Sequence, residues 1–470
     1  MTEPPAALDL VIIGAGPAGM AAAIAAARAG AAVLVLDEQP APGGQVHRAI
    51  EQRKADGTAM SRDDRAGAAL VEAFRASTAN IWADASVWQV ERLADADGFR
   101  ICLSRRGTVA AITARQLILA TGAIERPVPI AGWTLPGVMS VGAAQILLKT
   151  GGNVPAGRTI IAGQGPLVLL YAAQLLKLGI KPAAILNTTP PGAVRRALRH
   201  LPGALRDLAQ MATGLGFMAA IRNAGVPVMR GVCNVKALGQ GHVEQVSYLA
   251  AGRWQAMPAD LLLLHEGVVP HTHLAMSIGV AHDWDAHQLC WRPALGDDGQ
   301  TSVNGVRIAG DGGGIGGWRL ALMAGTLAGL AAARALGHGP GSARAEAAMR
   351  RAHARQAPFR RFLDAYHRPR EAILCPADEV IVCRCENTTA AQVRAAIAAG
   401  CTGPNQVKTA TRCGMGPCQG RECALTLTTL VAQARSISPQ AAGHLNIRPP
   451  LKPLTLGELA SLSGTAATHA

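Results

Sequence analysis

The sequence contains few aromatic residues, which make up 3% of its 470 positions. Single-stranded nucleic acids are held on stacked aromatic side chains, so no nucleic-acid partner is expected, although the formal net charge is +14. We interpret the basic excess as a solvated surface, with an acidic partner protein as the alternative. Because 49% of the residues are apolar, the core must consist mostly of Ala, Leu, Val and Ile, which favours an α/β fold with closely packed helices.

Long apolar runs are absent as well: no stretch of 18 or more uninterrupted apolar residues is present, so no membrane span is predicted. Residues 1–5 contain no basic side chain, and the first apolar run is short and ends in glycines, which is not typical of a signal peptide. We therefore expect a cytoplasmic protein. In that compartment the ten cysteines are predicted to be thiols or metal ligands rather than disulfides.

A dinucleotide-binding fingerprint lies near the N-terminus. An apolar run at 10–13 leads into Gly14-x-Gly16-x-x-Gly19, and an Ala-rich helical stretch follows. This strand–turn–helix context is the one that the fingerprint requires. Gly14 allows the tight turn, Gly16 lets the backbone approach a pyrophosphate, and Gly19 lets the helix pack on the strand. The helix N-terminus would then bind the pyrophosphate.

Three later segments would complete a flavin site. A second strand ends in Asp37 and Glu38, where an acid would bind a ribose hydroxyl. A strand ending in Ala-Thr-Gly and a strand ending in Gly-Asp resemble elements of flavoproteins with two dinucleotide-binding domains, where the final Asp binds the ribityl chain. The candidate FAD-binding residues are Gly14, Gly16, Pro17, Ala18, Gly19, Asp37, Glu38, Gln39, Gly44, Gln45, Thr121, Gly122, Gly310 and Asp311.

A second dinucleotide fold begins near Gly157, but it departs from the fingerprint. Val168 occupies the third glycine position, and the next strand ends in Asn187 where an acid is expected. We therefore expect the fold to be kept and NAD(P) not to bind tightly. The cluster around His271 and His273 follows Pro270 in a loop, so no metal site is predicted there.

The C-terminal part carries the densest cysteine group. Cys383 and Cys385 form Cys-x-Cys, and Cys413, Cys418 and Cys423 follow with four residues between neighbours. Four thiolates in a cytosolic protein indicate zinc or an iron–sulfur cluster. Because Cys-x-Cys is unusual for structural zinc, and the spacing resembles the bacterioferritin-associated-ferredoxin-like 2Fe–2S domain, a 2Fe–2S cluster is favoured. Its predicted ligands are Cys383, Cys385, Cys418 and Cys423, with Cys413 in reserve; Cys375 and Cys401 are predicted to be buried thiols.

The first 337 residues contain no Cys-x₂-Cys or Cys-x₄-Cys pair. A flavin-dependent disulfide reductase needs such a redox pair beside its flavin. The sequence therefore has the reductase scaffold without the reductase chemistry. We expect its electrons to leave through the C-terminal cluster, and no catalytic acid or base can be assigned.

Several motifs resemble the α (A) subunits of multimeric amino-acid dehydrogenases and oxidases, such as those of opine oxidase, D-hydroxyproline dehydrogenase, the proline dehydrogenase complexes and heterotetrameric sarcosine oxidase, together with the B subunit of hydrogen cyanide synthase. The segments that show this resemblance are 37–45, 135–143, 265–270, 383–386, 413–421 and 448–453. The resemblance implies an FAD- and 2Fe–2S-containing electron-transfer subunit. It also implies a hetero-oligomer with a β subunit similar to D-amino-acid oxidase, to which a small third subunit can be added. The implied contact with the respiratory chain is peripheral.

The expected fold is α/β, with two glutathione-reductase-like dinucleotide-binding domains and a small helical 2Fe–2S domain. The predicted boundaries are 1–150 for the first part of the FAD domain, 151–298 for the second dinucleotide domain, 299–337 for the FAD-domain return segment, 338–377 for a helical connector, 378–432 for the cluster domain and 433–470 for the tail. Two alternatives stay open: a self-sufficient NAD(P)H-dependent flavin oxidoreductase, and a non-catalytic protein holding a nucleotide such as ATP.

Overall fold

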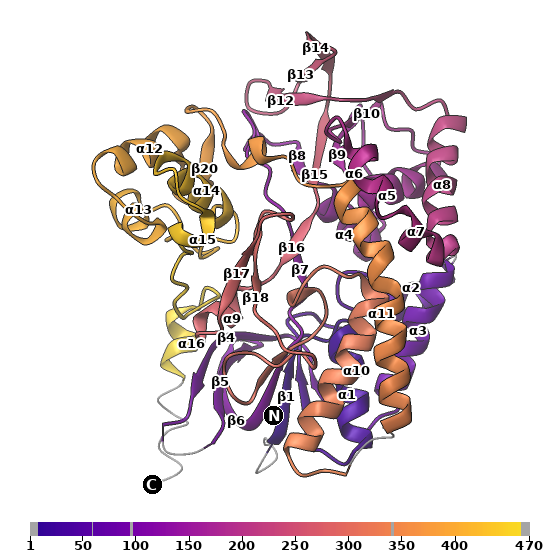
Figure 1. Ribbon diagram of the computed structural model, residues 1–470, viewed down its shortest axis with the longest axis vertical. Coiled ribbons are helices and arrows are strands. Elements are labelled where there is room, and N and C mark those ends of the chain that lie inside the picture. The colour runs from indigo at the N-terminus through magenta and orange to yellow at the C-terminus, as the bar shows by residue number, and fades with distance from the viewer. Residues whose placement is uncertain (1–7, 59, 95–96, 340–342, 462–470) are drawn as a thin grey trace.

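The computed structural model describes residues 8–58, 60–94, 97–339 and 343–461 (Figure 1). Its first sheet has the strand order β3-β2-β1-β6-β5-β4, and β19 also pairs with β6. The strands are β1 (Leu8–Ile13), β2 (Val33–Leu36), β3 (Asn80–Trp82), β4 (Ala85–Arg92), β5 (Phe99–Arg105), β6 (Thr108–Leu119) and β19 (Val306–Ile308). Strands β3, β2, β1, β6 and β19 are parallel, so their carboxyl ends share one edge, where nucleotides bind in such sheets.

Helix α1 (Pro17–Arg28) packs on α10 (Trp318–Ala335) through small residues. A Cβ atom at Gly325 would lie 2.1 Å from the carbonyl oxygen of Ala18, and one at Gly329 would lie 2.3 Å from that of Ala22. The two backbones therefore touch, and this contact needs no aromatic side chain. Helices α2 (Ile50–Ala55) and α3 (Arg62–Arg75) contact each other, and α3 also contacts α1.

The second sheet is parallel and has the order β11-β10-β9-β15-β8. Its strands are β8 (Val138–Ser140), β9 (Thr159–Gln164), β10 (Ala184–Asn187), β11 (Val228–Met229) and β15 (Leu261–Glu266). The associated elements are α4 (Val141–Gly151), α5 (Pro166–Lys177), α6 (Ala193–Leu198), α7 (Leu201–Ala204), η1 (Leu205–Asp207), α8 (Leu208–Asn223) and the antiparallel strands β12 (Cys233–Leu238), β13 (Gln245–Ala250) and β14 (Arg253–Pro258).

The chain enters the second sheet earlier than the predicted boundary at residue 150. Strand β8 pairs with β15, so β8 and the helix α4 that follows it belong with the second sheet. The two sheets are joined by the pair β7 (Ala123–Glu125) and β16 (Val268–Pro270). Beyond this pair lie α9 (His273–Ser277), the hairpin β17 (His282–Asp285) and β18 (Cys290–Pro293), and η2 (Gly310–Gly312).

The C-terminal region begins after the long helix α11 (Ala343–Tyr366), which packs on α6, α7 and α10. Its elements are η3 (Glu371–Leu374), β20 (Ile381–Cys383), β21 (Thr388–Thr389), α12 (Ala390–Ala398), α13 (Pro404–Thr411), α14 (Ala424–Ala434), α15 (Pro439–Ala442) and α16 (Leu456–Ala460). Thr389 caps α12 in a capping box with Gln392. In Figure 1 helices α12, α13, α14 and α15 lie at the upper left, above α9, and α16 lies lower.

The C-terminal domain shares its hydrophobic core with the first sheet. Leu427 packs in one cluster with Leu274 of α9 and with the first-sheet residue Leu103. Leu445 and Ile447 are buried in the same cluster, so part of the predicted tail belongs to this domain. Among the described residues, no helix has both the length and the apolar character needed to cross a membrane.

Candidate functional site

The first glycine turn has two glycines that the fold itself requires. Gly14 has φ +108°, and a Cβ atom there would lie 2.4 Å from the carbonyl oxygen of Ala120. A Cβ atom at Gly19 would lie 1.8 Å from the carbonyl oxygen of Gly14. Gly16 differs, because its φ is −75° and its nearest neighbour would be Gly44 Cα at 3.8 Å. The chain alone does not exclude a side chain at Gly16, so the open space beside it is available to a ligand.

This space lies at the N-terminus of α1. Gly16 is the N-cap residue and no side chain caps the helix, so the first backbone N–H groups stay free for an anion. The segments predicted for this site come together here. A Cβ atom at Gly44 would lie 2.8 Å from Gly16 Cα, and one at Gly310 would lie 2.7 Å from Ala18 Cβ.

The two acids that follow β2 have different surroundings. Asp37 is buried, and its carboxylate accepts hydrogen bonds from the N–H groups of Ala15 and Gln39. Burial raises its pKa. Glu38 is exposed and lies 2.7 Å from Lys452 Nζ. Of the two acids, Asp37 holds the glycine turn, whereas Glu38 stays exposed to solvent beside Lys452.

Asp311 holds the start of α10. Its Oδ1 accepts hydrogen bonds from the N–H groups of Gly316 and Gly317 at 2.9 and 3.0 Å. Close by, a Cβ atom at Gly312 would lie 3.4 Å from Thr121 Oγ1. Gly310, Asp311, Thr121 and Gly122 therefore lie together, whereas Gln45 is exposed and bonds Arg48.

The loop before α9 touches this site and the cysteine domain. Thr121 Oγ1 donates to the carbonyl oxygen of His271 at 3.1 Å, and the His271 N–H donates to that of Gly122 at 3.0 Å. His273 Nε2 lies 3.0 Å from the carbonyl oxygen of Gln419. Burial lowers the pKa of His271 to about 4 and that of His273 to about 3, so both rings are neutral at pH 7. The spacing of these histidines gave no sign of such a bridge.

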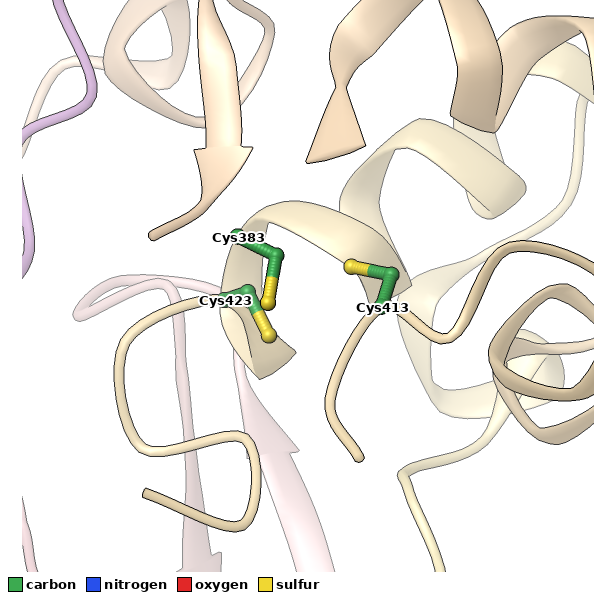
Figure 2. A group of neighbouring side chains, drawn as sticks. All are labelled: Cys383, Cys413 and Cys423. Carbon is green, nitrogen blue, oxygen red and sulfur yellow. The ribbon is translucent and has the colours of Figure 1, made fainter. Parts of the chain in front are cut away.

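Three buried thiols point toward one another in the C-terminal domain (Figure 2). Cys383 ends β20, Cys413 follows α13 and Cys423 precedes α14, and their Sγ atoms all lie within 4.8 Å of one another. Cys385 and Cys418, also predicted as ligands, form a neighbouring pair in contact through their side chains. The structure thus brings Cys383 and Cys423 together with the reserve residue Cys413.

The three thiols shift one another's pKa values. Cys413 and Cys423 donate to Cys383 and lower its pKa. The Cys383 thiolate in turn raises the pKa of Cys413 to about 12 and also raises that of Cys423. A second and third thiolate therefore need a compensating positive charge. Thiolate-only donor sets suit zinc or iron–sulfur clusters.

Glycines make room for the cysteine loop. A Cβ atom at Gly416 would lie 2.2 Å from Cys385 Cβ, and Gly414 lies beside Cys423 Sγ. Cys375 and Cys401, which the sequence led us to expect as buried thiols, are partly exposed. Both lie outside the group of three.

The second glycine turn is covered by the chain itself. A Cβ atom at Gly163 would lie 1.9 Å from the carbonyl oxygen of His265. Gln164 Nε2 donates to Glu266 Oε2 at 3.0 Å and to the carbonyl oxygen of Arg368 at 3.1 Å. Arg370 forms an ion pair with the buried Glu266. Residues 368–370 thus lie against the turn where a second dinucleotide would bind.

Comparisons with known proteins agree with this division. The family model described as pyridine nucleotide-disulphide oxidoreductase matches residues 8–328, and the sarcosine oxidase A3 domain matches residues 379–463. The crystal structure of L-proline dehydrogenase from P. horikoshii covers 97% of this chain and 81% of its own, with a TM-score of 0.70 and 20% identity. At that identity the match shows the fold alone.

Two curated relatives show the family. The A subunit of opine oxidase from Rhizobium meliloti (strain 1021) is 43% identical over 97% of this chain and 98% of its own length. The HcnB subunit of hydrogen cyanide synthase from Pseudomonas aeruginosa is 34% identical over 88% of this chain and 90% of its own. The chain therefore belongs to the oxidoreductase family that contains these opine oxidase and hydrogen cyanide synthase subunits, with a pyridine nucleotide-disulphide oxidoreductase fold followed by a sarcosine oxidase A3 domain.

Proposed function

We propose that this chain is the FAD- and 2Fe–2S-containing electron-transfer subunit of a multimeric amino-acid or amine dehydrogenase or oxidase. A catalytic β subunit similar to D-amino-acid oxidase would oxidise a donor of the D-hydroxyproline, opine, proline or sarcosine type, and this chain would pass the electrons to an acceptor. The observation that carries the proposal is the direct contact between the first nucleotide site and the C-terminal cysteine domain, through His271 and His273.

The first nucleotide site fits FAD. The uncapped N-terminus of α1 and the space beside Gly16 suit a pyrophosphate, and Glu38 suits an adenosine ribose. Asp311 would accept from ribityl hydroxyls. When bound, FAD would take up two electrons and a 2Fe–2S cluster would pass them on one at a time.

The cysteine domain fits a 2Fe–2S cluster. Such a cluster takes four thiolates, and the domain offers the pair Cys385–Cys418 beside the group of three. Cys383 and either Cys413 or Cys423 would supply the second pair. Zinc remains the competing ion, because it also binds four thiolates.

The alternative, a self-sufficient NAD(P)H-dependent flavin oxidoreductase, needs a working second nucleotide site. Gln164 is bonded to the carbonyl oxygen of Arg368, and Arg370 is paired with Glu266. Binding of NAD(P) at this turn would have to displace residues 368–370 and leave the buried carboxylate of Glu266 without its cation, which is costly. This geometry supports the relay over the alternative.

An exposed apolar face on α8 supports a hetero-oligomer. Leu208, Met211, Leu215 and Met218 follow the three- and four-residue spacing that places them on one helix face. Leu208, Leu215 and Met218 are 63%, 59% and 47% exposed. A partner subunit would cover this stripe. In the native complex, Leu215→Ser should weaken retention of the partner and leave the folding of this chain unchanged.

The proposal is tested by analysing protein purified without oxygen. It predicts bound FAD, iron and labile sulfide, and amino-acid oxidation only when a catalytic β subunit is added. Prompt reduction by NADH would favour the alternative, and a colourless protein retaining ATP would favour a non-catalytic role.

A further inference from the structure

A histidine ring from the nucleotide-binding part is hydrogen-bonded to the loop that bears the cysteines. Because the acceptor at 3.0 Å is the carbonyl oxygen of Gln419, His273 Nε2 must carry the proton and donate it. His273 is 9% exposed and stands at the start of α9. Its loop is itself anchored to Thr121 and Gly122 through His271. One short stretch of backbone therefore connects the two sites.

The carbonyl oxygen that His273 bonds belongs to Gln419, next to the predicted ligand Cys418. Gln419 follows Cys418 and has φ +52°, in the left-handed region that non-glycine residues rarely adopt. Its N–H donates to the carbonyl oxygen of Gly416 at 2.8 Å, and Arg421 Nε donates to that of Cys418 at 2.9 Å. With the bond from His273, these contacts fix the peptide groups between Cys418 and Cys423. N–H groups of this kind set the environment of cluster sulfurs.

A small cavity lies beside the His273 ring, and water could enter there if the ring were lost. It has a volume of about 40 Å³ and lies between the two parts, lined by His273, Trp291, Gly420 and His444 among others. Among the described residues, His273 Nδ1 and Trp291 Nε1 have no hydrogen-bond partner. The lining is mostly apolar, so these two ring nitrogens are the polar groups that a water could bond, and the volume exceeds the roughly 10–15 Å³ that one water needs. A smaller or apolar side chain at 273 would thus let the loop move and water approach.

We infer that His273 is a positioning residue that fixes the cysteine loop 413–423 against the first nucleotide site and so sets the surroundings of the thiolates. The inference deepens the proposed function, since it takes these thiols as the cluster ligands. The contact itself exists in the chain whatever the thiols bind. Loss of the His273–Gln419 hydrogen bond should make the loop 413–423 more mobile without removing any thiol.

The test compares the full-length protein with His273→Phe, which keeps a ring and loses the donor, and His273→Gln, whose amide replaces Nε2. His282→Gln is the matched control, because His282 is also buried but its Nδ1 lies 2.7 Å from the carbonyl oxygen of Val280, two residues earlier in the chain and outside the cysteine loop. Hydrogen–deuterium exchange is measured over 414–423. The electron paramagnetic resonance spectrum and midpoint potential are measured on dithionite-reduced protein.

We expect the Phe variant to exchange about tenfold faster over 414–423 and to show an altered spectrum and a shifted potential, while the Gln variant and the control stay within about twofold of wild type. His273→Leu serves as the donor-free variant if the Phe ring prevents folding. Unchanged exchange in the donor-free variant overturns the inference. Wild-type protein without iron contradicts the proposed cluster instead, and the exchange comparison still decides the positioning role.

Discussion

The ammonium of Lys452 lies 2.7 Å from the carboxylate of Glu38, although 414 positions separate the two residues in the sequence. Burial would raise the pKa of Glu38, but the hydrogen bond and the charge of Lys452 outweigh it, and the pKa is lowered. Glu38 is therefore ionised at neutral pH and can accept from ribose hydroxyls. The C-terminal segment thus reaches the rim of the first nucleotide site.

We predict that this ion pair contributes little to stability. Both partners are partly exposed, so Lys452→Met should lower the free energy of unfolding by less than about 1 kcal/mol. Leu451→Ala should cost about 2–4 kcal/mol, because Leu451 is 6% exposed within the shared core. Urea unfolding of both variants measures this difference. A larger loss from Lys452→Met would mean that charge, not burial, holds the segment.

Substitution by alanine should have different effects at Gly16 and Gly19 of the first turn: loss of flavin at one, and loss of folding at the other. Gly16→Ala meets no atom closer than 3.8 Å, so the chain should fold while its methyl group blocks the pyrophosphate and bound flavin is lost. In Gly19→Ala the Cβ atom would lie 1.8 Å from a carbonyl oxygen, so soluble folded protein should not accumulate. Flavin content per folded chain is the measurement. Full flavin content in Gly16→Ala would place the nucleotide elsewhere.

Single Cys→Ser variants should identify the cluster ligands. Substitution of Cys383, Cys385 or Cys418 should remove most of the iron and labile sulfide. Of Cys413 and Cys423, one substitution should do the same and the other should leave the cluster in place. Cys375→Ser is the control, since Cys375 belongs neither to the group of three nor to the Cys385–Cys418 pair. Iron retained in every variant would refute ligation by these residues, and zinc in place of iron would identify a structural zinc site.

The protein should lose stability in mild acid partly through His47. This ring is 1% exposed, and burial lowers its pKa to about 4. Between that value and about 6.5, the unfolded chain binds a proton that the folded chain does not. The free energy of unfolding should therefore fall as the pH decreases through this window, by up to about 3 kcal/mol from this residue.

His47→Gln should flatten this dependence between pH 7 and pH 5, as measured by urea unfolding. His287→Gln, at an exposed position, provides the comparison. An equal slope in wild type and His47→Gln would show that His47 is not a source of the acid sensitivity.

The glycine turns could be predicted from the sequence because each depends on local backbone chemistry. A strand, a turn and a helix are adjacent in the chain, so the sites around Gly14 and Gly163 are both visible in the residue pattern. The comparisons confirm the family, and of the fold they confirm the α/β pyridine nucleotide-disulphide oxidoreductase part. The strand that opens the second sheet, β8, lies before the predicted boundary at 150, and with only three residues it is too short to show a pattern.

The choice among the later cysteines could not be made from spacing, since Cys413–Cys418 and Cys418–Cys423 are equally separated. In the fold, Arg412 ends α13 in the left-handed region with φ +62°, which turns Cys413 toward Cys383. The contacts of Lys452 with Glu38 and of His273 with Gln419 are equally hidden, because they depend on how the C-terminal domain packs. The contacts of residues 368–370 with the second glycine turn could not be predicted either, because they depend on how distant parts of the chain pack.

The relay role is tested best by the visible spectrum of protein purified without oxygen, recorded before and after NADH and then after dithionite, with iron and sulfide determined on the same sample. We predict flavin and iron–sulfur bands that stay oxidised with NADH and bleach with dithionite. Prompt bleaching by NADH would show a working second nucleotide site and contradict the relay role, and the absence of iron and sulfide would contradict the cluster.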